Sequence, residues 1–145
     1  MITANFDTMN HILKGLELKM AFRRISDNLR PGGHFIFDLI TPCQPLGAGR
    51  NYSRRLRSRH CDAWQHIRWN PWQRILSIFV VMGSRFSKSS TLEAHRERAY
   101  SPVEVGRWLI DAGFIIRGIH DAATLLMAAG CPQRAIVVTR KKLGD

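Results

Sequence analysis

Apolar residues recur along the chain either every three to four positions, as in a helix, or in short continuous or alternating runs, as in a strand. The changes from one pattern to the other mark the boundaries of the predicted elements. Residues 34–40 form a near-continuous apolar run, typical of a parallel strand that is covered on both faces. A short apolar stretch over residues 1–6 reads as a strand as well. Between them, apolar side chains spaced by four, three and four residues predict an amphipathic helix over residues 16–29: Leu18, Phe22, Ile25 and Leu29. Together these elements predict one β-α-β unit with a right-handed crossover.

The middle of the chain changes to short polar and alternating segments. Residues 43–60 are rich in turn residues and arginine, which favours a solvated loop, although arginines at this density could also grip phosphates. Residues 63–70 and 74–82 alternate apolar and polar positions as a β-hairpin does, and residues 91–100 form a third run. We therefore expect a small antiparallel sheet that is inserted after the second core strand.

The last third returns to core-like patterns. Residues 101–104 read Ser-Pro-Val-Glu, a capping box with proline at the first helical position, and Gly113 supplies the stop. Two apolar strands are predicted at residues 114–121 and 134–140, with a possible short helical turn at residues 124–129 between them. The buried stripe of the predicted helix consists of Val105, Trp108, Leu109 and Ala112.

Length and composition indicate one globular domain. The chain has 145 residues, 45% of them hydrophobic, with four tryptophans, which is typical of a packed core. It contains no run of about 18 apolar residues, and its start lacks the basic-then-apolar pattern of a signal peptide, so the cytoplasm is the default expectation and no membrane contact is predicted. The three cysteines form no CxxC pair, so we expect reduced thiols and neither a zinc site nor a disulfide framework: Cys43, Cys61 and Cys131.

The formal net charge is +11, and 17 of the 22 basic residues are arginines. Such a charge permits attraction to nucleic acid, to acidic membrane surfaces or to anionic small molecules. A biased genome composition, or a chain that lacks an acidic portion, produces the same excess. The charge alone therefore leaves these classes of partner open.

Candidate chemistry lies in two places. Asp7 and Asn10 belong to a polar turn after the first strand, where open α/β sheets place their ligands, although either residue could instead cap the next helix. Glu93 and His95 share one face of the third middle run. We take His95 as the best general base or orienting residue of the chain. The alternative is that the glutamates pair with arginines and His95 forms an ordinary hydrogen bond.

Three segments, taken in order, carry a resemblance to a known family. They are residues 6–11, the turn 29–33 that leads into Phe-Ile-Phe-Asp, and the segment Glu-x-His-x-Glu-Arg-x-Tyr-Ser at 93–101 followed by Ala-Gly-Phe at 112–114. The chain resembles the C-terminal half of class I S-adenosylmethionine-dependent methyltransferases, in the branch that carries an antiparallel lid. The resemblance spans essentially the whole chain.

The resemblance implies an α/β fold with a partial Rossmann-like methyltransferase sheet. Its strands would be equivalent to the fourth to seventh of the family, the last one antiparallel, with an antiparallel β lid inserted. The implied parts are a β-α-β core part at residues 1–42, the lid at 43–100 and the completion of the core at 101–145, which together form one incomplete domain. The glycine-rich loop and the acidic residue that hold the cofactor in the family's first half have no counterpart here.

The resemblance also implies functional residues. The cofactor would be S-adenosylmethionine, with a small-molecule methyl acceptor and His95 as the catalytic residue. The residues beside the methionine part of the cofactor would be Asn5, Phe6, Asp7 and Asn10. Those on the acceptor side would be His11, Glu93, Arg98 and Tyr100.

Two alternatives remain beside a methyltransferase that acts in its complete form. One is a truncated, inactive remnant, in which residues 1–6 would form an exposed edge strand that can pair with another chain. The other is a basic module that binds nucleic acid without catalysis, which the charge permits but the motifs do not favour.

Overall fold

The computed structural model describes the chain as two compact units. Unit 1 comprises residues 1–45 and 98–145, and unit 2 comprises residues 46–97. Each unit is built around its own four-stranded sheet. The residues that the structure describes are 1–43, 52–57, 61–70, 72–84 and 90–143.

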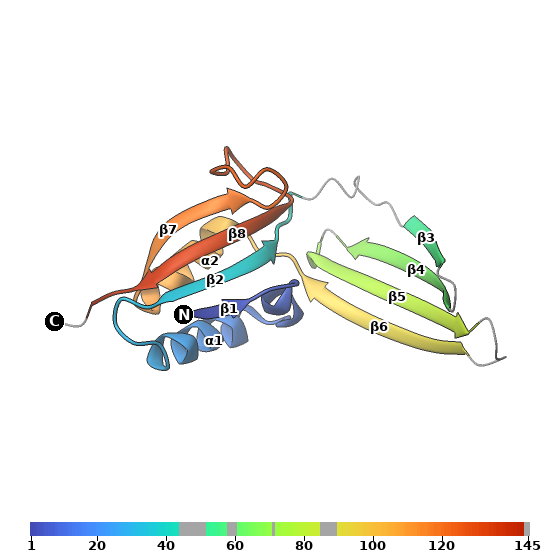
Figure 1. The fold of residues 1–145 in the computed structure, drawn as a ribbon, viewed down its shortest axis with the longest axis horizontal. Helices are drawn as coiled ribbons and strands as arrows, with labels where there is room; N and C mark the ends of the chain where they lie inside the picture. The colour runs from blue at the N-terminus through green and yellow to red at the C-terminus, as the bar shows by residue number, and fades with distance from the viewer. Residues whose placement is uncertain (44–51, 58–60, 71, 85–89, 144–145) are drawn as a thin grey trace. The chain divides into compact units, whose positions relative to one another are not determined.

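Unit 1 is an α/β layer with the strand order β1-β2-β8-β7 (Figure 1). β1 pairs with β2 in parallel, whereas β8 runs antiparallel to both of its neighbours. The predicted β-α-β unit and the antiparallel last strand are therefore confirmed. The elements of unit 1 are β1 (Ile2–Ala4), the 3-10 helix η1 (Thr8–His11), α1 (Gly15–Asp27), β2 (His34–Ile40), α2 (Pro102–Asp111), β7 (Phe114–Asp121) and β8 (Arg134–Lys141).

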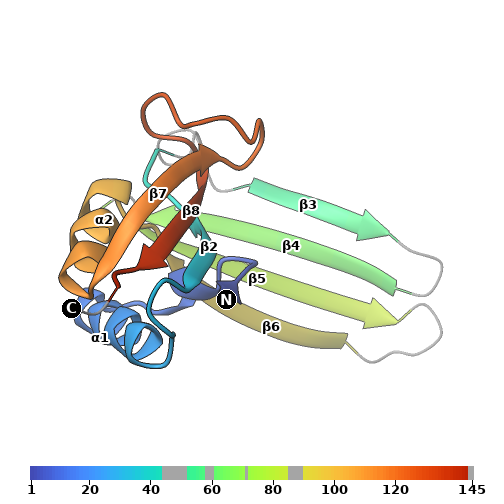
Figure 2. The same ribbon diagram turned by 60° about the vertical axis from the view of Figure 1, so that its left-hand side comes forward.

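Both helices cover one face of this sheet (Figures 1 and 2). The ring of Phe22 in α1 lies 6.3 Å from the ring of Phe35 and 5.7 Å from that of Phe37, measured between centroids. The two β2 residues are separated by one position, so they share the face that the helices cover. The core of unit 1 also includes Leu18, Leu39, Val105, Leu109, Phe114, Ala135 and Val137.

The helix ends differ in detail from the predictions. α1 ends at Asp27, and Leu29 is buried just beyond it. α2 begins at Pro102 as predicted, but the side chain of Ser101 forms no capping hydrogen bond to the helix, so the capping box was wrong. Within the described residues, 124–129 form no helix either; they are a turn in which Met127 bridges to His120, and Leu125 has a φ of 61°.

Unit 2 is a sheet without helices among its described residues (Figure 2). Its strand order, β3-β4-β5-β6, follows the chain, and the first two pairs are antiparallel. The inserted antiparallel sheet is therefore confirmed. The strands are β3 (Tyr52–Arg57), β4 (Cys61–Asn70), β5 (Ile75–Ser84) and β6 (Ser90–Arg98).

β3 corrects the solvated loop that was predicted at residues 43–60. Tyr52–Arg57 pairs along its whole length with residues 62–67 of β4. Its run of arginines lacks an apolar alternation, so pairing with a neighbouring strand decides its conformation here rather than local sequence preference. The remaining parts of that predicted loop, 44–51 and 58–60, lie outside the described residues.

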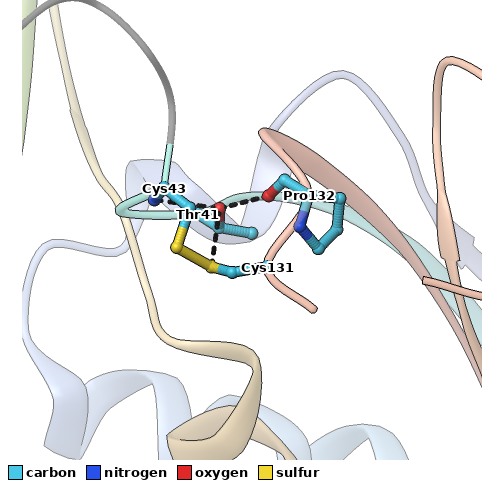
Figure 3. Close-up of a disulfide and its surroundings, with 4 residues drawn as sticks. All are labelled: Thr41, Cys43, Cys131 and Pro132. Carbon is cyan, nitrogen blue, oxygen red and sulfur yellow. Dashed lines mark hydrogen bonds between the residues drawn. A yellow bond between two sulfur atoms is a disulfide. The ribbon is translucent and has the colours of Figure 1, made fainter. Parts of the chain in front are cut away.

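The expectation of three reduced thiols was also wrong. Cys43 and Cys131 form a disulfide with their Cα atoms 5.8 Å apart (Figure 3). The hydroxyl of Thr41 donates to the carbonyl of Pro132 and accepts a hydrogen bond from the N–H of Cys43. It therefore bonds to the backbone next to both cysteines of the disulfide. The two cysteines are 88 positions apart, and only the tertiary fold brings them together.

Candidate functional site

The polar turn after β1 lies at the carboxyl edge of the parallel pair β1 and β2, because neighbouring parallel strands end at the same side of a sheet. Phe6 and Asp7 both have a φ of 59°, in the left-handed region that non-glycine residues rarely adopt. The N–H of Asp7 donates to both carboxylate oxygens of Asp38, at 3.2 and 3.3 Å. Consecutive residues held in this region are typical of functional loops, where the surroundings impose the conformation.

Arg134, at the start of β8, joins the two carboxylates of this edge. Its guanidinium is 2.5 Å from Oδ2 of Asp7 and 3.3 Å from Oδ2 of Asp38. The two aspartate side chains are 14% and 13% exposed, whereas that of Arg134 is 43% exposed. The Arg134 guanidinium thus pairs with two nearly buried carboxylates, so the cluster can hold a further positively charged group.

The carboxyl group of Asp7 is the most perturbed member of this cluster. Burial raises the pKa of Asp7 above its ordinary value of 3.8; the Arg134 guanidinium opposes this rise, and the nearby carboxylate of Asp38 adds to it. Within the described part of the chain, its Oδ1 atom is buried without a hydrogen-bond partner. A buried acceptor of this kind is costly unless a ligand or water supplies a donor.

A cavity of about 370 Å³ opens beside the cluster. Ile36 and Asp38 line it from the face of β2 opposite to the helices, since they alternate with the buried Phe35 and Phe37. Phe6, which is 84% exposed, contributes its ring. The remaining lining residues are Asn5, Phe37, Ala122, Arg134 and Ile136.

The side chain of Asn10, unlike those of Asn5, Phe6 and Asp7, is fully buried and bonded to the backbone of other segments. Its amide nitrogen donates to the carbonyls of Ile40, at 3.0 Å, and Arg98, at 2.7 Å. Its amide oxygen accepts the N–H of Ile40 at 3.0 Å. Asn10 therefore fastens the end of β2 to the end of β6.

Arg98 and Tyr100 also bind the backbone of unit 1. The guanidinium of Arg98 donates to the carbonyl of Leu13 at 3.0 Å and lies 5.3 Å over the ring of Tyr100. Tyr100 is 1% exposed and its hydroxyl donates to the carbonyl of Ile12. Burial raises the pKa of this phenol. The two side chains hold the linker between η1 and α1.

The other predicted site residues fall into separate places. His11 is exposed at the end of η1, and its electrostatic effect lowers the pKa of Asp7 against the larger rise caused by burial. Glu93 and His95 belong to unit 2, where His95 Nε2 lies 3.3 Å from a carboxylate oxygen of Glu93 and the side chains are 52% and 47% exposed. The structure thus places Asn5 and Phe6 at one cavity, Asp7 beside two of its lining residues, Asp38 and Arg134, and the Glu93–His95 pair on β6.

Asp38 and Arg134 are site residues that the sequence reasoning missed. Asp38 is the one acidic residue inside an apolar strand, and this signal could have identified it, because a charge in a covered strand needs a partner. Arg134 gave no such signal, since it lies 127 positions from Asp7 in the chain.

The described residues contain no group of three or more His, Cys, Asp or Glu side chains that could hold a metal ion. Within the same part of the chain, no helix is long and apolar enough to cross a membrane.

The fold is shared with solved methyltransferase structures. One is an S-adenosylmethionine-dependent methyltransferase from Clostridium acetobutylicum. Its alignment covers 97% of this chain and 57% of the methyltransferase, with a TM-score of 0.83 and 20% sequence identity. The CcbJ methyltransferase from Streptomyces caelestis aligns with 96% of this chain and 59% of its own, with a TM-score of 0.78 and 20% identity.

A third similar structure is an amino pentose methyltransferase from Micromonospora echinaspora with S-adenosylmethionine bound. The alignment covers 97% of this chain and 58% of that methyltransferase, with a TM-score of 0.70 and 14% sequence identity. No protein-family model and no curated protein sequence matches the chain. At these identities the likeness shows the fold: a partial Rossmann-like methyltransferase sheet with an inserted antiparallel sheet. The chain spans little more than half the length of the solved structures that it matches.

Proposed function

We propose that this chain is the acceptor-side part of an S-adenosylmethionine-dependent methyltransferase that acts on a small molecule. The observation that carries the proposal is the Asp7 carboxylate, held nearly buried at the carboxyl edge of β1 with one oxygen unpartnered among the described residues. In open α/β sheets this edge is where ligands bind. The fold is that of methyltransferases, and the position of Asp7 in it supports a role toward the cofactor.

The residues at this edge fit the methionine part of the cofactor. An ammonium group can donate to Oδ1 of Asp7, and a carboxylate can pair with the exposed side of Arg134. Asn5 and Phe6 offer an amide and an aromatic ring in the adjoining cavity. When bound, the cofactor supplies a methyl group on a positively charged sulfur, so the protein's task is chiefly to orient the acceptor in line with that bond.

We assign positioning roles to Asn10, Arg98 and Tyr100 rather than contact with the cofactor or acceptor. Asn10 donates to the carbonyls of Ile40 and Arg98, and Arg98 and Tyr100 donate to the carbonyls of Leu13 and Ile12, which directly follow the segment that carries Asp7. They therefore act on the site by fixing the path of the chain from β1 to α1.

On the acceptor side, we propose that His95 receives the proton that the acceptor loses, with Glu93 orienting its imidazole and His11 adding a polar contact. The similar solved structures include an amino pentose methyltransferase and a sugar N-methyltransferase. Those names support a small polar acceptor here, whose nitrogen or oxygen attacks the methyl group as its proton leaves.

β1 is the end strand of the unit 1 sheet among the described residues. We propose that residues 1–6 pair through their outer edge with a further strand, since an end strand presents unpaired N–H and C=O groups. A strand of another chain or of the same protein would fill this position and complete the wall beside Asp7.

A titration of the ¹⁵N-labelled 145-residue chain with S-adenosylhomocysteine and with methionine tests the cofactor role. With only the methionine part held, we expect weak binding, with a Kd on the order of 1 mM or about 4 kcal/mol. The amide signals of residues 5–7, Asp38 and Arg134 should shift together. Asp7→Asn should weaken both ligands several-fold, and Asp27→Asn, an exposed change on α1, should leave both unchanged.

Shifts confined to other parts of the chain, or no shift at 5 mM ligand (about five times the expected Kd), would refute the proposal. Equal weakening by Asp7→Asn and Asp27→Asn would refute it too, because the effect would then reflect overall charge.

A further inference from the structure

The positive charge of the chain is concentrated in unit 2. Residues 46–97 contain ten of the 22 basic residues and three of the eleven acidic ones, a formal net charge of +7 in 52 residues. Unit 1 carries the remaining +4 in 93 residues. The inserted sheet is thus far more basic per residue than the core, and its field attracts anions.

One face of this sheet carries polar and aromatic residues in three adjacent rows. Ser53 in β3, His66 in β4 and Phe79 in β5 are register partners. The next row on the same face has Arg55, Trp64 and Val81, and the row on the other side has Arg68 and Ser77. None of these eight residues is acidic; the acidic residue of β4, Asp62, lies one row beyond Trp64 as the register partner of Arg57. We call the set Ser53, Arg55, Trp64, His66, Arg68 and Phe79 the Ser53–Arg68 face.

A chain of hydrogen bonds crosses the face and fixes the direction of each donor. The Nε–H of Arg68 lies 3.3 Å from His66 Nε2, and His66 Nδ1 lies 2.6 Å from the hydroxyl oxygen of Ser53. A guanidinium can only donate, so Nε2 accepts and Nδ1 carries the proton that it donates to Ser53. The hydroxyl of Ser53 keeps its own hydrogen for a further acceptor. His66 cannot take that hydrogen in this arrangement, so the pair is a donor array and not a nucleophile with its base.

The two arginines of the face are held in place by aromatic rings. The guanidinium of Arg68 lies 5.9 Å from the ring centroid of Phe79, and that of Arg55 lies 5.3 Å from that of Trp64. Trp64 is 51% exposed, so this packing occurs at the surface. Guanidinium groups placed in this way lose less freedom when they bind an oxyanion than free side chains do, and they suit bidentate contacts to phosphate.

We propose that the Ser53–Arg68 face binds the phosphate or diphosphate group of a small molecule. The donors belong to three successive rows, so they span roughly 13 Å along β4, which one phosphorylated small molecule covers. The Ser53 hydroxyl and the two guanidinia supply the charge-assisted donors that such oxyanions take. Resting on the function proposed above, the bound group is the anionic part of the methyl acceptor.

Isothermal titration of the full 145-residue chain with pyrophosphate and with a nucleoside diphosphate, at low and moderate salt, tests the site. We expect Arg68→Gln to raise the Kd of both ligands about tenfold and Ser53→Ala about three- to tenfold. Arg68→Lys, which keeps the charge but not the bond geometry, should fall between Arg68→Gln and wild type. Arg23→Gln removes the same charge from an exposed position on α1 and should change the Kd less than twofold. Thermal unfolding of each variant confirms that it is folded.

Three results would overturn the inference. The first is the absence of pyrophosphate binding by the wild-type chain at millimolar concentration. The second is an equal loss in Arg68→Gln and Arg23→Gln, which would reduce the site to overall charge. The third is tight, strongly salt-dependent binding of a single-stranded oligonucleotide that depends on Arg68 while pyrophosphate does not compete, which would make the face a nucleic-acid platform. The titration involves neither cofactor nor methyl transfer, so its failure is separable from a failure of the proposed function.

Discussion

Replacing Asn10 by alanine should destabilise the protein far more than an ordinary loss of an asparagine. Its side chain is fully buried and exchanges three hydrogen bonds with the backbone of Ile40 and Arg98. These residues end the strands through which the chain leaves for unit 2 and returns from it. The substitution therefore acts on the backbone of unit 1 at Ile40 and Arg98, and Asn10 itself lies three positions after Asp7.

The magnitude follows from which groups lose their partner. The carbonyl of Ile40 also accepts the N–H of Tyr100 at 3.2 Å, so it remains bonded. The Ile40 N–H and the Arg98 carbonyl each lose the bond to Asn10. A buried polar group left unsatisfied costs about 1–3 kcal/mol, so we expect a loss of about 3 kcal/mol in the free energy of unfolding, or about 10 °C in Tm for a chain of this size.

Asn28→Ala is the matched control for this experiment. The side-chain amide of Asn28 also donates to a backbone carbonyl, that of Arg24 at 2.8 Å, but on the surface at the end of α1. We expect it to cost less than about 1 kcal/mol, since water replaces the lost bond. Urea unfolding followed by circular dichroism measures both variants. Equal losses in Asn10→Ala and Asn28→Ala would refute the structural role assigned to the buried hydrogen bonds of Asn10.

Three further changes test other parts of the structure. Burial raises the pKa of Asp7 above 3.8, so the ionised carboxylate destabilises the folded state at neutral pH, and this effect is lost as the pH falls through the raised pKa. The free energy of unfolding of wild type, relative to that of Asp7→Asn, should therefore increase as the pH falls from about 6 to about 4. A difference that stays constant over this range in urea unfolding would contradict the assignment. Replacing Cys43 and Cys131 together by serine should lower the free energy of unfolding by about 4 kcal/mol, because the bridge joins residues 88 positions apart; a dithiol reductant should reproduce the loss in wild type and have no effect on the double variant. Phe22→Ala should cost about 3–5 kcal/mol, since the ring is fully buried against Phe35 and Phe37, whereas Phe6→Ala, at a ring that is 84% exposed, should change the Tm by less than about 2 °C.

The fold of unit 1 could be predicted largely from local pattern. The spacing of Leu18 and Phe22 and the apolar run at residues 34–40 each depend on one element and its covered face, and both are seen. β3 and the disulfide could not be predicted in this way. β3 is a strand because β4 pairs with it, and the disulfide exists because the fold brings Cys43 to Cys131.

The candidate site, too, contains residues that a local signal predicts and residues that only the tertiary fold brings together. Asp7 was predicted because it follows a strand directly, which is a local signal. Its partners Asp38 and Arg134 lie 31 and 127 positions away, and only the sheet order places β1, β2 and β8 side by side. The buried bonds of Asn10 and Tyr100 are equally long-range, spanning up to 88 positions. Residue type and spacing could therefore suggest these residues for a site without showing that their side chains bind the backbone.

Photolabelling tests most directly whether the Asp7 turn meets the cofactor. The 145-residue chain would be irradiated with S-adenosylmethionine that carries tritium in its methyl group, digested with trypsin and mapped by mass spectrometry. Lys14 is the first lysine or arginine of the chain, so residues 5–11 are recovered in the tryptic peptide 1–14. We expect the label in this peptide, and we expect excess S-adenosylhomocysteine to remove it. Label found only in peptides from residues 46–97, or label in peptide 1–14 that S-adenosylhomocysteine does not displace, would contradict the account.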